Sequence, residues 1–195
     1  MAHGYLLASF LSPLTNLRQD GYGGSVANRL RFPLEVLAAV RAALPADKPI
    51  SVRLSSSDWA PGGLPEGELI EIARAMKSGG TDMLDLSSGQ TVPWQKPVYG
   101  RMWQTPFSDL VRNVVDIPTI AVGNIYEADH ANSIIASGRA DLCALARPHL
   151  ADPAWTLRAA AEQHWHEQWW PPQYDSAKRQ LERNLERAAQ MAGPV

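Results

Sequence analysis

The sequence contains a single cysteine, no excess of either charge and no long apolar run, and each absence narrows the class of protein. Cys143 alone excludes a disulfide framework and a cysteine-rich metal site. The 18 Lys and Arg against 20 Asp and Glu argue against a nucleic-acid or membrane-surface protein. No apolar run reaches the roughly 18 residues of a spanning helix, and the first residues lack a signal-peptide pattern. At 195 residues, we expect a cytoplasmic globular protein of one domain, or one and a fraction.

Apolar runs alternate with helical spacing along most of the chain. Four short runs are typical of buried strands, at residues 50–55, 82–86, 117–122 and 141–145. Helical periodicity lies between them, with a helix predicted over 26–44 and others around residues 69–76, 107–114 and 131–135. Thr105 followed by Pro106 predicts a helix cap and a first-turn proline. Strands alternating with helices predict a parallel sheet covered by helices.

The number of strand–helix units points to half of a barrel. No Gly-x-Gly-x-x-Gly follows a strand, which counts against a dinucleotide-binding open sheet. A complete (β/α)8 TIM barrel needs about 250 residues, so four units make half of one. We therefore predict a half barrel over residues 1–163, followed over 164–195 by an aromatic, proline-containing arm and a charged helix from about Asp175 to Met191.

Two arginines and a glycine stand where barrel enzymes place their chemistry. Arg53 interrupts an apolar strand, which indicates either an internal salt bridge, for instance with Asp85, or a cation facing an anionic ligand. Gly123 and Arg147 follow the last two strands, where barrels commonly bind phosphate. The alternative is a tight turn at Gly123 and a surface charge at Arg147.

The histidines show no zinc-ligand spacing, so we predict no metal site. We expect His130 on the exposed side of its short helix. In an extended chain, His3 and Tyr5 point to one side, where a His–Tyr pair binds a carbonyl oxygen and supplies a proton.

Several motifs together closely resemble the old yellow enzyme family, FMN-dependent ene reductases and NADH:flavin oxidoreductases built on a (β/α)8 barrel. The matching residues cover about 2–163 and include His3-Gly4-Tyr5-Leu6, Tyr22-Gly23-Gly24-Ser25, Ser51-Val52-Arg53-Leu54-Ser55, Asp85-Leu86-Ser87-Ser88-Gly89, Ala121-Val122-Gly123 and Gly138-Arg139-Ala140-Asp141-Leu142. The resemblance implies the C-terminal half of such a barrel.

The resemblance also implies roles for individual residues. Tyr5 matches the family's proton donor, and His3 matches a residue that hydrogen-bonds the substrate carbonyl. Arg53 matches the cation near the flavin N1–O2 edge. The flavin-phosphate cradle falls on Gly123, Asn124, Ala146 and Arg147. The implied reaction takes hydride from NAD(P)H through FMN to an activated alkene.

The tail is similar to a narrower group. Trp169-Trp170-Pro171-Pro172-Gln173-Tyr174 and the basic segment after it resemble the C-terminus of bifunctional aromatic acyl-CoA monooxygenase/reductases, such as salicylyl-CoA 5-hydroxylase and 2-aminobenzoyl-CoA monooxygenase/reductase. In related barrels this tail offers an arginine to a neighbouring active site, a role that Lys178 or Arg179 would take here. The alternative is a packing arm with a solvated helix.

Other functions remain open at this point. A non-catalytic half-barrel association module without flavin is one alternative, favoured by Ala146 where the family usually has glycine. A phosphate-binding isomerase or aldolase is another, but no Lys or Glu stands at a strand end. Because a half barrel exposes two strand edges and part of an apolar interior, we expect a homo-oligomer or a missing N-terminal segment as partner, and a small-molecule substrate.

Overall fold

The computed structural model describes residues 1–192. The chain divides into two compact units, Met1–Leu145 and the residues from Ala146 onward. These compact units describe packing, and the functional boundary between residues 163 and 164 stays a prediction. No helix among residues 1–192 is both long enough and apolar enough to cross a membrane.

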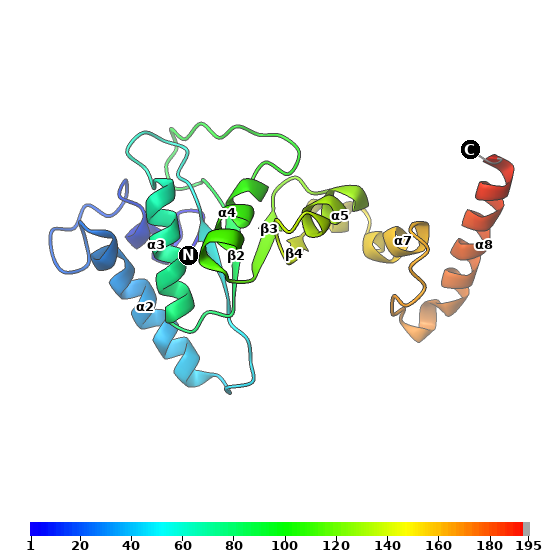
Figure 1. Cartoon of the computed structure of the whole chain (residues 1–195), viewed down its shortest axis with the longest axis horizontal. Coiled ribbons are helices and arrows are strands. Elements are labelled where there is room, and N and C mark those ends of the chain that lie inside the picture. Colours follow the sequence, from blue (N-terminus) through cyan, green and yellow to red (C-terminus); the bar gives the residue numbers. More distant parts are fainter. Residues whose placement is uncertain (193–195) are drawn as a thin grey trace. The chain divides into compact units, whose positions relative to one another are not determined.

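A four-stranded parallel sheet forms the centre of the first unit (Figure 1). The strands are β1 (Ser51–Ser55), β2 (Met83–Ser87), β3 (Thr119–Val122) and β4 (Leu142–Ala144), and they pair in chain order. All four coincide with predicted strands. Consecutive parallel pairing with a helix in each connection is the pattern of (β/α)8 barrels, so the predicted half barrel is confirmed.

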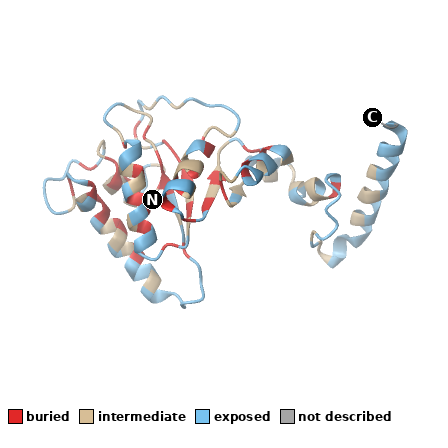
Figure 2. Cartoon of the chain, viewed as in Figure 1, coloured by how far each residue is buried: buried red, intermediate tan, exposed pale blue. Residues whose placement is uncertain are grey.

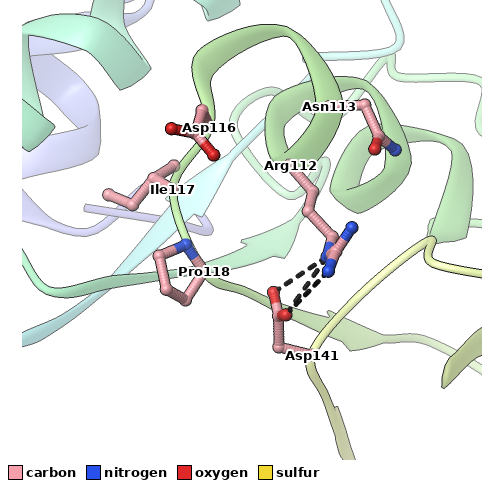
Figure 3. A pocket seen from close by; sticks show the side chains of 6 residues that line it. All are labelled: Arg112, Asn113, Asp116, Ile117, Pro118 and Asp141. Atoms are coloured by element: carbon pink, nitrogen blue, oxygen red, sulfur yellow. Dashed lines mark hydrogen bonds and ion pairs between the residues drawn. The ribbon is translucent and has the colours of Figure 1, made fainter.

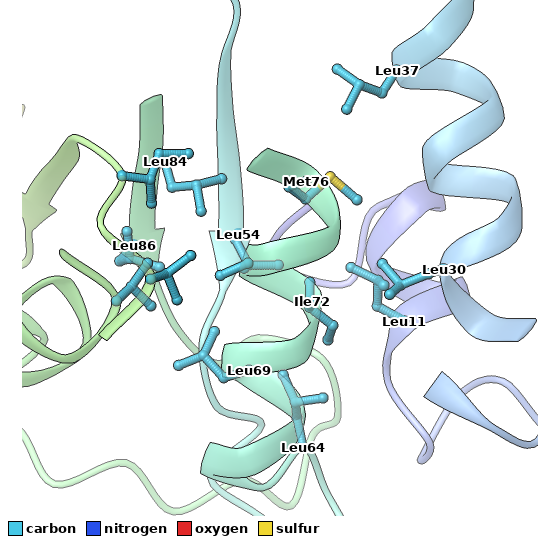
Figure 4. Packing of buried hydrophobic residues seen from close by; sticks show 14 of the residues in the cluster. Leu11, Leu30, Leu37, Leu54, Leu64, Leu69, Ile72, Met76, Leu84 and Leu86 are labelled. Atoms are coloured by element: carbon cyan, nitrogen blue, oxygen red, sulfur yellow. The ribbon is translucent and has the colours of Figure 1, made fainter. Parts of the chain in front are cut away.

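The helices of this unit are α1 (Leu6–Leu11), α2 (Val26–Ala43), α3 (Glu66–Ser78), α4 (Thr105–Val115) and α5 (Ala128–Ala136). The main core lies between the strands and α2, α3 and α4 (Figure 4). Leu54, Leu84 and Leu86 from the strands are fully buried, as are Ile72 and Met76 from α3. Each such side chain contributes about 1.5–3 kcal/mol, so this layer holds the sheet in place.

Among the described residues of the first unit, no comparable layer covers the opposite face of the sheet. Because side chains alternate along a strand, the register puts one residue of each strand in a row on this face: Arg53, Asp85, Ile120 and Leu142. Leu142 is 52% exposed. An incompletely covered apolar inner face is what half of a barrel presents.

Two local predictions are wrong. Thr105 does not cap α4: it is the first residue of the helix, Gln104 takes the cap position, and the buried Thr105 hydroxyl makes no hydrogen bond within the described residues. His130 is buried rather than exposed, with its ring edge-on to Tyr126 at 4.6 Å between centroids. The start of α5 at Ala128 turns this side chain inward.

The second unit contains α6 (Arg147–Ala151), α7 (Trp155–Glu162), a short 3-10 helix η1 (Pro172–Tyr174) and α8 (Asp175–Ala192). The charged helix predicted from Asp175 is therefore confirmed. Figure 2 shows that α8 is mostly exposed, and none of its described side chains is buried.

Candidate functional site

Polar groups gather at the C-terminal edge of the sheet. The strands are parallel, so the segments that follow Ser55, Ser87 and Val122 all leave the same edge. The connections after β1 and β2, residues 56–65 and 88–104, run on the same side of the first unit in Figure 1. In barrel enzymes this edge carries the active site.

His3 reaches this edge from a tight turn. Both central residues of the turn, His3 and Gly4, have positive φ, at +57° and +72°, and the Tyr5 N–H closes it onto the Ala2 carbonyl. A β-carbon at Gly4 would lie 2.7 Å from the Gln90 carbonyl oxygen, so glycine permits both the backbone angle and the close approach. The predicted extended geometry of His3 and Tyr5 is therefore wrong.

The imidazole of His3 is held by Ser87. His3 Nε2 lies 2.6 Å from Ser87 Oγ, and the His3 backbone N–H donates to Ser55 Oγ at 2.9 Å. Burial and, next, the positive charge of Arg53 lower the pKa of His3 below its ordinary value. A lowered pKa favours the neutral imidazole, which has one N–H donor and one acceptor nitrogen.

Gln104 connects the ends of β2 and β3. Its Oε1 accepts hydrogen bonds from Ser88 Oγ at 2.6 Å and from Ser87 Oγ at 3.4 Å, and its Nε2 donates to the Val122 carbonyl at 3.0 Å. Trp59 Nε1 donates to Ser88 Oγ at 2.8 Å. Since Gln104 is buried, these bonds satisfy an amide that would otherwise be unfavourable there.

Gly123 and Asn124 form the turn after β3. Gly123 has φ +112° and Asn124 φ +53°, the left-handed region that glycine and asparagine tolerate best. Asn124 Nδ2 donates to the Gly100 carbonyl at 2.9 Å. The turn after β3 is thus hydrogen-bonded to the loop after β2, and its role in binding phosphate stays a prediction.

Arg53 pairs with Asp85 across β1 and β2, where the register makes them direct neighbours. Arg53 Nε lies 3.4 Å from Asp85 Oδ2, and the Arg53 side chain stays 44% exposed. Burial raises the pKa of Asp85, while Arg53 opposes that change. Both interpretations of Arg53 are therefore compatible: it makes the internal salt bridge, and its side chain remains partly exposed.

Among the described residues of the first unit, the Tyr5 side chain makes no hydrogen bond to this network. Tyr5 is 75% exposed at the start of α1. Ala146 and Arg147 belong to the second unit, where Arg147 is the first residue of α6. Their part in a site stays a prediction.

A polar pocket at the opposite edge of the sheet has a structural explanation. It measures about 220 Å³ and lies beside the starts of β3 and β4 (Figure 3). Arg112 donates through Nε and Nη2 to Asp141, whose Oδ2 also accepts from the Thr119 N–H. In barrel enzymes, residues at this N-terminal edge stabilise the fold and the catalytic residues lie at the other edge.

Sequence reasoning missed the connecting residues. Gln104, buried just before Thr105, and Trp59, in the loop after β1, were not among the predicted site residues. Ser87 and Ser88 were named only as members of the motif Asp85-Leu86-Ser87-Ser88-Gly89, without a role in the site. The available signal was the pair of serines directly after an apolar strand, in the place where barrels put polar ligands.

The half barrel and the polar network at its C-terminal edge are those of a barrel enzyme, and comparison with known proteins identifies its family. The sequence profile of the NADH:flavin oxidoreductase / NADH oxidase family matches residues 1–165. The chain belongs to this family. It is 47% identical over 161 residues to an NADPH dehydrogenase of a Geobacillus species (strain WCH70), covering 83% of this chain and 46% of that protein.

Solved structures give the same result. A 2-naphthoyl-CoA reductase bound to 2-naphthoyl-CoA is 31% identical with a TM-score of 0.74, covering 81% of this chain and 25% of the other. Morphinone reductase in complex with tetrahydroNAD is 30% identical with a TM-score of 0.62, covering 82% and 42%. The chain thus spans about half the length of the curated relative and less of these two enzymes.

Proposed function

We propose that this chain supplies the C-terminal half of the barrel of an FMN-dependent NAD(P)H oxidoreductase that reduces an activated alkene or an aromatic acyl-CoA. The observation that carries the proposal is that His3 is hydrogen-bonded to Ser87 at the end of β2, while Arg53 on the neighbouring strand β1 keeps its side chain 44% exposed. Arg53 is suited to an anionic ring edge, and His3 to a substrate carbonyl.

The residues present fit a flavin. The Arg53 side chain is 44% exposed, and Gly123 and Asn124 give the turn after β3 two consecutive residues with positive φ. We assign the phosphate to the turn of Gly123 and Asn124, and the roles proposed for Ala146 and Arg147 rest on the sequence resemblance alone. When bound, FMN would accept hydride from NAD(P)H and pass it to the substrate.

The chain's own residues would act on the substrate. His3, held through Ser87, would donate a hydrogen bond to the carbonyl oxygen and polarise the adjacent double bond. Tyr5 would supply a proton from its phenol hydroxyl to the carbon that does not receive hydride. Arg53 would stabilise negative charge on the reduced ring.

We further propose that the half-barrel domain spans residues 1–163 and the arm with its helix 164–195, that the protein works in the cytoplasm, and that it acts as a homo-oligomer or with an N-terminal half-barrel segment. A single cysteine cannot form a disulfide within the chain, which suits the reducing cytoplasm. The partly exposed inner face, including Leu142, supports the partner.

The test is a titration of the purified 195-residue chain with FMN, followed by flavin fluorescence and absorbance. We expect quenching that saturates, and weaker binding for Arg53→Gln but not for Arg74→Gln, an exposed arginine on α3. A colourless protein that leaves flavin fluorescence unchanged would contradict the proposal and favour the association module.

A further inference from the structure

The loop between β2 and α4 carries an exposed aromatic surface that the proposed chemistry does not use. Trp94 is 57% exposed, Val98 74% and Tyr99 72%. Tyr99 packs edge-on to Trp103 at 4.9 Å between ring centroids, and Trp103 lies 5.6 Å from Trp59. The rings of Trp59, Trp103 and Tyr99 form a continuous aromatic row, from the half-buried Trp59 to the exposed Tyr99.

This aromatic row is fixed to the candidate site. The Lys96 N–H donates to the Trp59 carbonyl at 2.8 Å, which joins the loops after β1 and β2. Trp59 Nε1 binds Ser88 Oγ, and Gln104 accepts from Ser88, next to the Ser87 that holds His3. The row therefore begins at the network around His3 and extends outward from it.

The loop is also cationic. Residues 88–104 contain Lys96 and Arg101 and no Asp or Glu. Within the described part of the chain, no ion pair joins either side chain to a carboxylate, and both residues are exposed. The one acid of the facing loop, Asp58, is buried and accepts from Ser12 Oγ and the Leu64 N–H. The ligand that complements this surface has a planar ring and separate negative charges.

We propose that Trp94, Tyr99 and Trp103, with Lys96 and Arg101, bind an aromatic acyl thioester whose carrier bears phosphate groups, such as an aromatic acyl-CoA. The ring would lie along the aromatic row, and the phosphates would meet the two cations. The loop follows β2, which is paired on both sides, so strands added at the free edges of β1 or β4 would leave it in place. This assignment deepens the proposed function and rests on it.

The test is calorimetric binding of benzoyl-CoA, coenzyme A and NADPH to the FMN-supplemented 195-residue chain. We expect Tyr99→Leu to weaken benzoyl-CoA about fivefold while leaving coenzyme A nearly unchanged. Lys96→Gln with Arg101→Gln should weaken both about fivefold to tenfold and reduce their salt dependence. Arg74→Gln and Tyr174→Leu, exposed residues outside the segment 88–104, should bind as the unaltered chain does.

The result that overturns the assignment is absence of benzoyl-CoA binding, or equal binding by the loop variants and the two controls. NADPH binding that depends on Lys96 and Arg101 while benzoyl-CoA binding does not would also overturn it, in favour of the dinucleotide. FMN titration of the same samples separates the two proposals: loop-dependent benzoyl-CoA binding by a chain that fails to bind FMN supports this surface and contradicts the oxidoreductase. Circular dichroism confirms that each variant is folded.

Discussion

The side chain of Gln104 occupies the space that a β-carbon at residue 123 would need. A β-carbon built on Gly123 would lie 2.4 Å from Gln104 Nε2, which is shorter than an allowed van der Waals contact. The same Nε2 donates to the Val122 carbonyl, so the turn after β3 and the start of α4 are fitted to each other. A substitution at residue 123 must therefore disturb either the φ angle or the Gln104 network.

We expect Gly123→Ala to lower the free energy of unfolding by about 1–3 kcal/mol. Alanine is strained at the positive φ of this residue, and its β-carbon would also clash with Gln104. FMN binding should weaken as well, measured by flavin fluorescence. Gly123→Ala combined with Gln104→Ala relieves the clash but retains the strain, so it should recover only part of the affinity. An unchanged melting temperature and unchanged FMN binding in Gly123→Ala would contradict the close fit.

His3 gives a prediction about pH. Its pKa in the folded chain is lowered by burial and by Arg53, so between that value and the unfolded value near 6.5 the unfolded chain binds more protons. Stability should therefore fall as pH drops through this window, and His3→Gln should reduce the fall. Denaturant unfolding at pH 7 and pH 5 measures the difference.

Ser87→Ala tests how the His3 ring is held. The hydroxyl lies 2.6 Å from Nε2, and loss of this contact removes the hydrogen bond between the two side chains. We expect the His3 ring to become more mobile and its pKa to change. NMR titration of the ring protons measures this pKa, and the pH profile of the reaction should shift with it. Ser57→Ala, a serine in the loop after β1 that does not contact His3 among the described bonds, is the matched control. Identical ring signals in Ser87→Ala and Ser57→Ala would rule out the contact.

Arg112 should matter for stability and not for flavin. Its guanidinium makes three contacts of 3.1 Å to Asp141, a charge-assisted arrangement worth about 1.5–3 kcal/mol. Arg112→Ala should lower the unfolding free energy by about that amount and leave FMN affinity per folded molecule unchanged. A selective loss of FMN affinity would move function to this edge.

Asp141 sets the pH dependence of the same pair. Burial opposes ionisation, but hydrogen bonds from Arg112 and the Thr119 N–H outweigh it and lower the pKa of Asp141. The stabilisation is present above the unfolded value near 4 and is lost as pH falls below it. Acid unfolding of Asp141→Asn should start from lower stability and depend less on pH in that range.

Much of the architecture followed from local pattern. The strand and helix positions, the half barrel and the charged helix from Asp175 came from hydrophobic periodicity and turn residues, because these report which face of an element is buried. The cation of β1 was also visible, since Arg53 breaks an apolar run. Its partner, Asp85, was one of several acids until the register of β1 and β2 placed them side by side.

The site depended on information that no local pattern contains. Alternation placed His3 and Tyr5 together, whereas two left-handed residues turn His3 toward Ser87 and leave Tyr5 exposed. The burial of Gln104 and its fit against Gly123 arise between residues that are far apart along the chain. Periodicity follows from the geometry of one element, but hydrogen-bond partners are chosen when separate elements pack, and that packing exists only in the folded chain.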